Sequence, residues 1–364
     1  MLDFPINDVY APVGWIFVAL LAANLVLFVA LVVLREQWVF LARRRERIQA
    51  RLAPVVERLL ASDDPEDAAE QLRPVVAGLG WQERPVAAWI LRDLTRDADE
   101  QTRAGVRALL EDSGAVELTE RSTRRWMPWR RALACEILGT LGAERSVPVL
   151  VERLEDHRSE VRLAAARALG AIGSPAATPS LTSVFLERRA VPTGVAYDAL
   201  RALGPHGSEA FRRGLSSPDP TLRVASCFGV AALAGAGDGA AAVEAVAGLL
   251  AGDDNTRVRT AAAKALGVIG GTASPRALVE AAADPELRVR REAVASLGVF
   301  DDPDSVGLLA AAAGDPDREV ALRSAEALLA LRARPAAGAA AGAAFSASRA
   351  WSVDYVRTIS ELAA

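Results

Sequence analysis

The sequence predicts an all-α protein, an α-α superhelix of stacked helix pairs preceded by a single transmembrane helix. Three observations predict this class. Hydrophobic residues make up 51% of the chain but aromatic residues only 5%, so the core must be built from closely packed, alanine-rich helices. From about residue 130 a motif recurs with a period of about 31 residues, as expected of a repeat array. Residues 12–34 carry no charged side chain.

The uncharged stretch at 12–34 is long enough to cross a membrane as one helix. At 1.5 Å per residue it spans about 35 Å, compared with about 30 Å for the hydrocarbon core of a bilayer. Residues 1–11 are then a short extracytoplasmic segment. They contain Asp3 and Asp8 and no basic residue, which disfavours a cleavable signal peptide.

Basic residues after the span set its orientation, because positive charge is retained on the cytoplasmic side. We therefore expect a single-pass protein of the cell (inner or plasma) membrane, with its N-terminus outside, its C-terminal part cytoplasmic, and the lipid bilayer contacted through residues 12–34. The basic residues are Arg35, Arg43, Arg44, Arg45, Arg47 and Arg51.

Three residues of the span, Ala19, Ala23 and Asn24, are candidates for packing against another transmembrane helix. An amide at mid-depth requires a hydrogen-bond partner, and small residues let two helices approach closely. The alternative is that Asn24 is a tolerated lone amide.

The cytoplasmic part divides into residues 35–125, a juxtamembrane helix with degenerate helical repeats, and residues 126–332, the regular repeats. Each regular unit reads as two antiparallel helices. We expect Asp284, with the proline after it, to cap a first helix, and a Leu-Gly pair to end that helix with the glycine in a left-handed conformation. The Leu-Gly pairs lie at 138/139, 169/170, 203/204, 266/267 and 297/298.

A second recurring feature is an aspartate followed six positions later by an arginine. This spacing resembles the Asp/Arg ladder of HEAT repeats, and the short alanine-rich period is similar to that of the phycobilisome-lyase type. The resemblance covers about residues 130–332 and implies that these side chains bridge adjacent turns. The unit around Arg223 departs from the pattern, since residue 217 is Ser, which puts that ladder step in doubt. The pairs are Asp156/Arg162, Asp253/Arg259, Asp284/Arg290 and Asp317/Arg323.

The C-terminal part has two segments. Residues 333–348 are rich in Ala, Gly and Ser and predict a flexible linker. Residues 349–364 predict an amphipathic helix with Trp351, Tyr355, Ile359 and Leu362 on one face. That helix either caps the array or docks on a partner.

The sequence offers no catalytic, metal-binding or cofactor-binding residues, so we expect no cofactor and no small-molecule substrate. Deoxyhypusine hydroxylases, which are HEAT-repeat enzymes, carry paired His-Glu motifs, whereas His157 is followed here by Arg and His206 by Gly. Cys135 and Cys227 read as buried core residues. The net charge of −4 argues against a nucleic-acid partner.

One cluster of arginines and tryptophans precedes the first clear repeat and is a candidate contact for a protein partner or for lipid. The alternative is that its tryptophans pack under the first repeat while its arginines pair with acidic neighbours. The cluster comprises Arg121, Arg124, Arg125, Trp126, Trp129, Arg130 and Arg131.

These features together predict a membrane-anchored, non-enzymatic scaffold for protein–protein interaction, with partners whose identity the sequence does not reveal. Two alternatives remain open. One is an enzyme of the HEAT/lyase type, and the other is a regulatory subunit of a membrane enzyme such as a glycosyltransferase or a signalling kinase.

Overall fold

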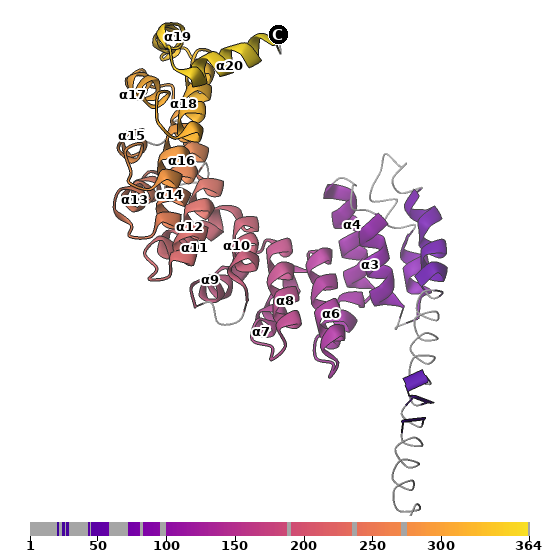
Figure 1. Ribbon diagram of the computed structural model, residues 1–364. Helices are drawn as coiled ribbons and strands as arrows, with labels where there is room; N and C mark the ends of the chain where they lie inside the picture. The colour runs from indigo at the N-terminus through magenta and orange to yellow at the C-terminus, as the bar shows by residue number, and fades with distance from the viewer. Residues whose placement is uncertain are drawn as a thin grey trace, which may run out of the picture. The chain divides into compact units, whose positions relative to one another are not determined.

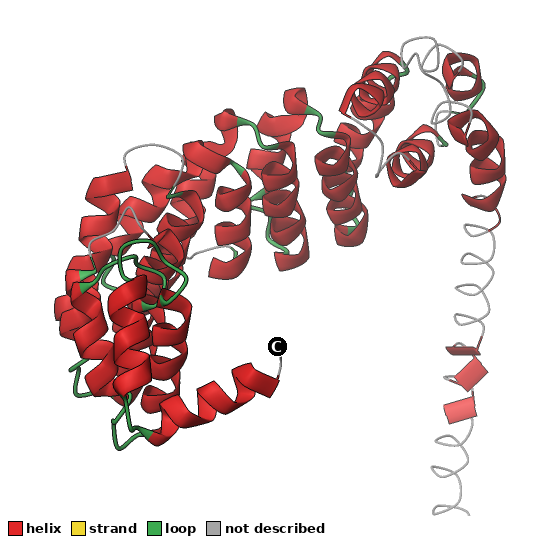
Figure 2. Ribbon diagram, turned by 90° about the horizontal axis from the view of Figure 1, so that it is seen from above, coloured by secondary structure: helices red, strands yellow, loops and turns green. Residues whose placement is uncertain are grey.

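The structure is a computed structural model, and the part of the chain that it describes consists of helices and the loops between them, without a strand (Figure 2). The predicted all-α class is therefore confirmed for these residues. They are residues 43, 45–57, 72–80, 83–94, 100–187, 191–234, 239–270 and 275–362, together with Leu20, Leu21, Asn24, Leu25, Leu27 and Phe28.

The predicted membrane span at 12–34 lies largely outside these residues, and Ala19 and Ala23 are among those not described. Asn24 is described, and its Nδ2 donates a hydrogen bond of 2.9 Å to the carbonyl oxygen of Leu20. The amide thus has a hydrogen-bond partner four residues earlier in the chain. In the part of the chain that the structure covers, no helix combines the length and apolar character needed to cross a bilayer.

Internal contacts divide the chain into two compact units, Met1–Leu118 and Thr119–Ala364. The first unit contains helical residues 45–57 and 72–77, followed by α3 (Arg84–Leu94) and α4 (Glu100–Asp112). The fully buried side chains of this unit include Leu52, Leu72, Val76, Leu91 and Leu110.

The second unit begins within α5 (Ala115–Ser122) and then alternates between two helix layers (Figure 1). Each first-layer helix packs against the next first-layer helix along the chain, and most second-layer helices contact the first-layer helix that follows them. The first layer is α6 (Pro128–Leu141), α8 (Ser159–Ile172), α10 (Thr193–Ala202), α12 (Pro220–Leu233), α14 (Thr256–Ile269), α16 (Leu287–Leu297) and α18 (Arg318–Leu331). The second layer is α7 (Val147–Arg153), α9 (Thr178–Glu187), α11 (Ser208–Leu215), α13 (Gly239–Gly252), α15 (Arg276–Ala281), α17 (Asp304–Ala312) and α19 (Gly338–Ala347).

The Leu-Gly glycines mostly serve a purpose other than the predicted one. Gly139 lies inside α6, where an added Cβ atom would be 2.4 Å from Cα of Ala168 in α8. Gly267 lies inside α14, and its Cβ would be 2.4 Å from Oγ of Ser296 in α16. Glycine at these positions lets neighbouring first-layer helices approach closely, and α6 ends only at Gly142, which has φ 63°. The prediction that the Leu-Gly pair ends the helix is therefore wrong at both positions, although Gly204 does follow α10 with φ 58°.

Aspartates do cap first-layer helices, but not at the predicted position. Asp317 caps α18, and its Oδ1 accepts hydrogen bonds from the first-turn backbone N–H groups. Asp219 caps α12 in the same way, ahead of Pro220. The predicted cap was Asp284, but α16 begins after Glu286. The Asp284 carboxylate instead accepts the Glu286 N–H at 2.8 Å in the preceding loop.

The range predicted as a flexible linker, 333–348, is another correction. It contains α19, which packs against α17 and α18 and buries Ala341 and Phe345. Alanine is the strongest helix former, and Phe345 supplies an apolar side chain large enough to fix the helix to its neighbours. A composition typical of linkers therefore forms a packed helix here.

Candidate interaction surface

Polar side chains of the repeats form a ladder of ion pairs that links α6 to α8, α12 to α14, α14 to α16 and α16 to α18. In each ladder pair an arginine on a first-layer helix binds an aspartate that lies just before the next first-layer helix. Both carboxylate oxygens accept from the guanidinium, as in Arg131–Asp156, where the two distances are 2.9 and 2.8 Å. The ladder pairs among the described residues are Arg131–Asp156, Arg223–Asp253, Arg259–Asp284 and Arg291–Asp317.

The predicted six-residue spacing has a different physical origin. Nη1 of Arg162 donates to the backbone carbonyl oxygen of Asp156 at 2.8 Å, and Arg259 and Arg290 bind the carbonyl six positions earlier in the same manner. Because the acceptor is a carbonyl, Arg223 makes the equivalent bond to Ser217 at 2.9 Å. The ladder step that the sequence put in doubt is therefore present. Arg323 was expected to link to Asp317 but instead donates to Oε1 of Glu319, from Nε at 3.2 Å and from Nη2 at 3.0 Å.

The ladder carboxylates are held in the ionised form. Burial opposes ionisation of Asp156, but the hydrogen bonds from Arg131 and from the Arg158 backbone N–H outweigh it and hold the pKa of that carboxyl below its ordinary value. The same balance lowers the pKa of Asp253 and of Asp284. At Asp317 the hydrogen bonds from Arg291 and the Val320 N–H lower the pKa to about 2.

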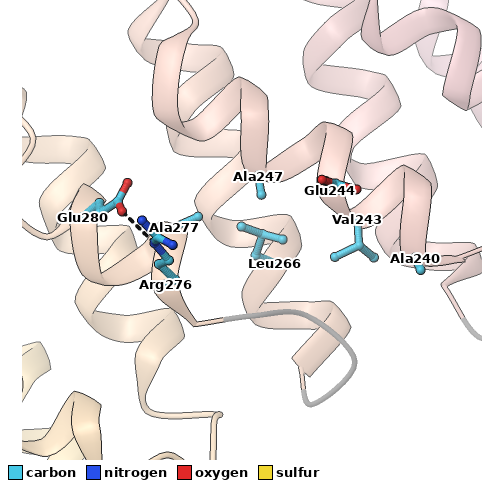
Figure 3. Close-up of a pocket in the computed structure, with 8 residues that line it drawn as sticks. All are labelled: Ala240, Val243, Glu244, Ala247, Leu266, Arg276, Ala277 and Glu280. Atoms are coloured by element: carbon cyan, nitrogen blue, oxygen red, sulfur yellow. Dashed lines mark hydrogen bonds and ion pairs between the residues drawn. The ribbon is translucent and has the colours of Figure 1, made fainter.

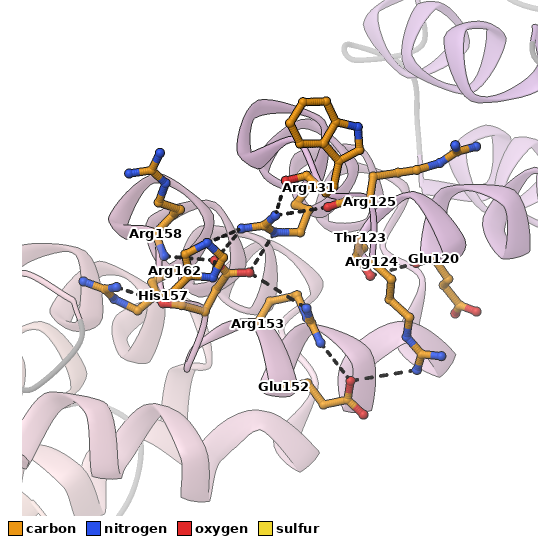
Figure 4. Close-up of polar contacts among 12 residues, drawn as sticks. Glu120, Thr123, Arg124, Arg125, Arg131, Glu152, Arg153, His157, Arg158 and Arg162 are labelled. Atoms are coloured by element: carbon orange, nitrogen blue, oxygen red, sulfur yellow. Dashed lines mark hydrogen bonds and ion pairs between the residues drawn. The ribbon is translucent and has the colours of Figure 1, made fainter.

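The arginine–tryptophan cluster splits into a buried member and an exposed surface. Arg131 was predicted to contact a partner or lipid, but its side chain is only 6% exposed and is engaged with Asp156. Its Nη1 also donates to the carbonyl oxygens of Arg125 and Trp126, both at 3.0 Å. Arg131 therefore holds the loop from within, and Figure 4 shows Arg125 extending away from its guanidinium.

The other six residues of the cluster, hereafter the Arg/Trp surface, are all exposed: Arg121, Arg124, Arg125, Trp126, Trp129 and Arg130. Trp126 is 81% exposed and Trp129 56% exposed, so neither packs under the first repeat. The Arg130 guanidinium lies 5.0 Å from the Trp129 ring centroid, a cation–π contact. Leu133, one turn after Trp129, is also exposed.

Acidic neighbours offset little of this positive charge. Oε1 of Glu120 accepts from the Ser146 hydroxyl at 2.6 Å, so this carboxylate is tied to the start of α7. Glu152 accepts from Arg153 at 3.1 Å and has Arg124 at 3.9 Å (Figure 4). Among the described residues, the pairing expected by the alternative interpretation is thus one contact of 3.9 Å, between Arg124 and Glu152.

A second exposed set of apolar side chains lies on α20 (Trp351–Leu362). This helix contacts α18 through a buried face that contains Ser352, Val353 and Val356, and the Ser352 hydroxyl donates to the Ala313 carbonyl at 2.7 Å. Trp351, Tyr355 and Ile359 form an exposed stripe on the other side. The helix therefore covers the last repeat with one face and leaves the predicted apolar face available.

A pocket of about 480 Å³ lies between α13, α14 and α15 (Figure 3). Most of its lining is alanine, valine and leucine. Its polar residues are Glu244, Arg276 and Glu280, and Arg276 donates to Glu280 at 3.2 Å, so two of the three neutralise each other. Among the described residues no group of three or more His, Cys, Asp or Glu side chains is placed to hold a metal ion.

Comparison with known proteins identifies the family to which these repeats belong. The model of the HEAT-repeat family matches residues 117–204, 208–296 and 275–358, which is more than half of the chain. No curated protein sequence matches significantly.

The chain is also similar to solved structures. Importin beta is 14% identical, with a TM-score of 0.51 over 77% of this chain and 45% of its own, so this chain spans less than half of importin beta. An engineered protein is 19% identical, with a TM-score of 0.38 and coverage of 84% and 96%. Human deoxyhypusine hydroxylase is 22% identical, with a TM-score of 0.30 and coverage of 73% and 96%. Layered helix pairs, the ladder and the family match lead to one conclusion: the chain belongs to the HEAT-repeat family.

Proposed function

We infer that this protein is a membrane-tethered, non-enzymatic scaffold whose repeats bind a protein partner in the cytoplasm. One observation carries this inference. The second unit, Thr119–Ala364, is hereafter the repeat unit, and its buried core is mainly alanine and leucine. Most of its exposed large apolar side chains lie at its two ends, on the Arg/Trp surface and on the α20 stripe. Exposed aromatic side chains beside arginine are typical of contact surfaces.

The tether is the second part of the proposal. Its support is the uncharged run at 12–34 with arginines after it. A tethered array is held near membrane proteins, which raises its effective concentration for them, so modest affinity is sufficient. Packing of Ala19, Ala23 and Asn24 on another span would extend the same complex into the bilayer.

The α20 stripe is the surface we assign to the protein partner. Trp351 is flanked by the Arg318 guanidinium at 5.5 Å from its ring centroid, and Tyr355 and Ile359 continue the stripe along the helix. These side chains stand at i, i+4 and i+8, which is the pattern that anchors one helix against another.

The proposal is tested by purifying the tagged full chain from solubilised membranes and identifying the bound proteins by mass spectrometry. We expect a defined set of proteins that disappears in a Tyr355→Ser/Ile359→Ser variant. The matched control is Val268→Ser/Val299→Ser, which alters exposed apolar side chains outside the stripe. Equal recovery from both variants would assign the partner to another surface, and no specific protein from any of them would remove the scaffold function.

Topology is tested separately on intact cells. We expect added protease to leave the repeats undigested until the membrane is permeabilised. Digestion of the repeats in intact cells would contradict the cytoplasmic location.

A regulatory subunit of a membrane enzyme, such as a glycosyltransferase or signalling kinase, is a special case of this scaffold, and the recovered proteins would identify it. The lyase-type enzyme has less support, because the polar lining of the pocket at α13–α15 is largely a paired Arg276 and Glu280.

A further inference from the structure

A short loop of similar backbone contacts precedes several first-layer helices, and its residues differ in the first repeat. In each such loop we compare two residues: the one whose carbonyl oxygen binds the arginine six positions later, and the residue after it. In later repeats these two residues are Asp156-His157, Ser217-Pro218, Asp253-Asp254 and Asp284-Pro285, and all of them except His157 are small or acidic. In the first repeat they are Arg125-Trp126.

Part of this difference is explained by position in the array. The aspartate of a later loop accepts the ladder arginine of the repeat before it, as Asp156 accepts Arg131. Arg131 is the first ladder arginine of the described pairs, so the loop before it needs no acceptor. A missing acceptor explains why residue 125 is not Asp, but it does not explain an indole that is 81% exposed beside it.

The loop is also fixed in place. Arg131 binds the carbonyl oxygens of residues 125 and 126 and is itself anchored by both carboxylate oxygens of Asp156. The backbone that carries Arg125 and Trp126 is therefore held before any ligand arrives. Preorganisation of this kind reduces the entropy lost on binding.

The chemistry of the Arg/Trp surface matches an anionic bilayer surface. Guanidinium groups attract anionic lipid headgroups, and indole rings favour the zone between headgroups and acyl chains. Trp126 projects from the surface, so its ring can insert into the headgroup region of a bilayer. The charged residues of the Arg/Trp surface are all positive. A bilayer is also the one anionic surface that the proposed tether would keep permanently within reach.

We propose that the Arg/Trp surface docks the repeat unit on anionic lipid headgroups of the membrane in which the chain is anchored. This inference rests on the proposed tether for its local concentration. It leaves the α20 stripe, at the other end of the repeat unit, for the protein partner.

The test uses the full chain with a reporter beside the surface. A Leu133→Cys variant carries an environment-sensitive fluorophore one turn after Trp129. Burial raises the pKa of the native Cys135 and Cys227 thiols to about 12, so labelling at neutral pH is directed to the new cysteine. The labelled chain is reconstituted into nanodiscs of phosphatidylcholine alone or of phosphatidylcholine with about one third phosphatidylglycerol.

We expect a blue shift of the fluorophore in the anionic discs only. At about 1 kcal/mol per arginine, Arg124→Ala/Arg125→Ala reduces the ratio of docked to free repeat units about 30-fold. The control is Arg257→Ala/Arg288→Ala, which removes two exposed arginines from α14 and α16 and leaves the shift unchanged.

The outcomes separate this inference from the tether. A chain that enters both kinds of disc but gives the same emission in each keeps the tether and overturns lipid docking. If the chain stays outside the discs, the tether is wrong, and the same labelled protein is then mixed with free vesicles. A fluorescence response to anionic vesicles would support lipid docking, and no response would overturn lipid docking. A response to polyglutamate without a response to anionic vesicles assigns the surface to an acidic protein and also overturns the inference.

Discussion

The Arg131–Asp156 pair provides the sharpest test of the ladder. Its side chains are 6% and 3% exposed, and the two charges meet through bonds of 2.9 and 2.8 Å. Replacing either residue with Ala leaves the other charge buried, which typically costs about 3–5 kcal/mol. We expect the low end for Arg131→Ala, because Asp156 keeps Arg153 at 3.8 Å and the Arg158 N–H at 3.0 Å.

The Arg291–Asp317 pair is the matched comparison. It has the same bidentate geometry, with bonds of 3.0 and 2.8 Å, but its side chains are 29% and 21% exposed. Water screens this pair and solvates whichever partner remains after a substitution. We therefore expect a smaller loss for either single substitution and a smaller coupling between the two.

The assay is a double-mutant cycle for each pair, with the free energy of unfolding measured in urea. Hydrogen exchange of the backbone amides is measured as well, in α6 and α8 for the first pair and in α16 and α18 for the second. Local exchange is needed because a repeat array can open in parts. A coupling free energy at Arg291–Asp317 equal to or greater than that at Arg131–Asp156 would refute the reasoning that burial sets the strength of the ladder.

Three further predictions follow from the described contacts. Gly139→Ala should lower the free energy of unfolding by about 1–3 kcal/mol, because the added Cβ would overlap Ala168. Gly248→Ala is the control: its Cβ would have nothing within 4 Å, so this substitution should stabilise α13 by about 0.5–1 kcal/mol. Equal effects of the two substitutions in urea unfolding would contradict this packing. The ladder aspartates have pKa values below 3.8 when folded, and Asp317 about 2, so their stabilisation is complete above the unfolded value and lost as pH falls from about 4 toward 2. Acid unfolding monitored by circular dichroism should show that loss, and a loss already complete at pH 5 would exclude the ladder as its cause. Phe211→Ala should cost about 3–5 kcal/mol, because this fully buried ring contacts two other aromatic rings, and a change below 1 kcal/mol in the same assay would show that the site collapses.

The repeat fold could be predicted because its signals are periodic and local. Buried alanines and leucines recur at helical spacing, and the Asp and Arg positions recur with them. What could not be predicted is which partner each side chain takes. Arg162 binds the backbone carbonyl of Asp156, an acceptor that every residue type supplies. The sequence pattern indicated a bond to the Asp156 side chain, but the main chain makes that bond.

The predictions for Gly139 and for the C-terminal tract were wrong for the same reason, because the role of each depends on a neighbouring helix. Gly139 could end a helix or admit a neighbouring helix, and only the position of Ala168 decides between the two. The Ala/Gly tract at 333–348 has the composition of a linker, but α18 offers it an apolar surface to pack on. Likewise, Arg131 belongs by sequence to the Arg/Trp cluster, and its burial depends on an aspartate 25 positions later.

Because every ladder pair joins an arginine of one unit to an aspartate that introduces the next, the bond energy belongs to the junction and not to either unit. A single excised helix pair would lack half of each junction and should not hold its shape alone. Insertion or deletion of a whole unit between α12 and α18, in contrast, restores a complete junction at the splice, so this part of the array can change length by duplication without redesign of its polar contacts.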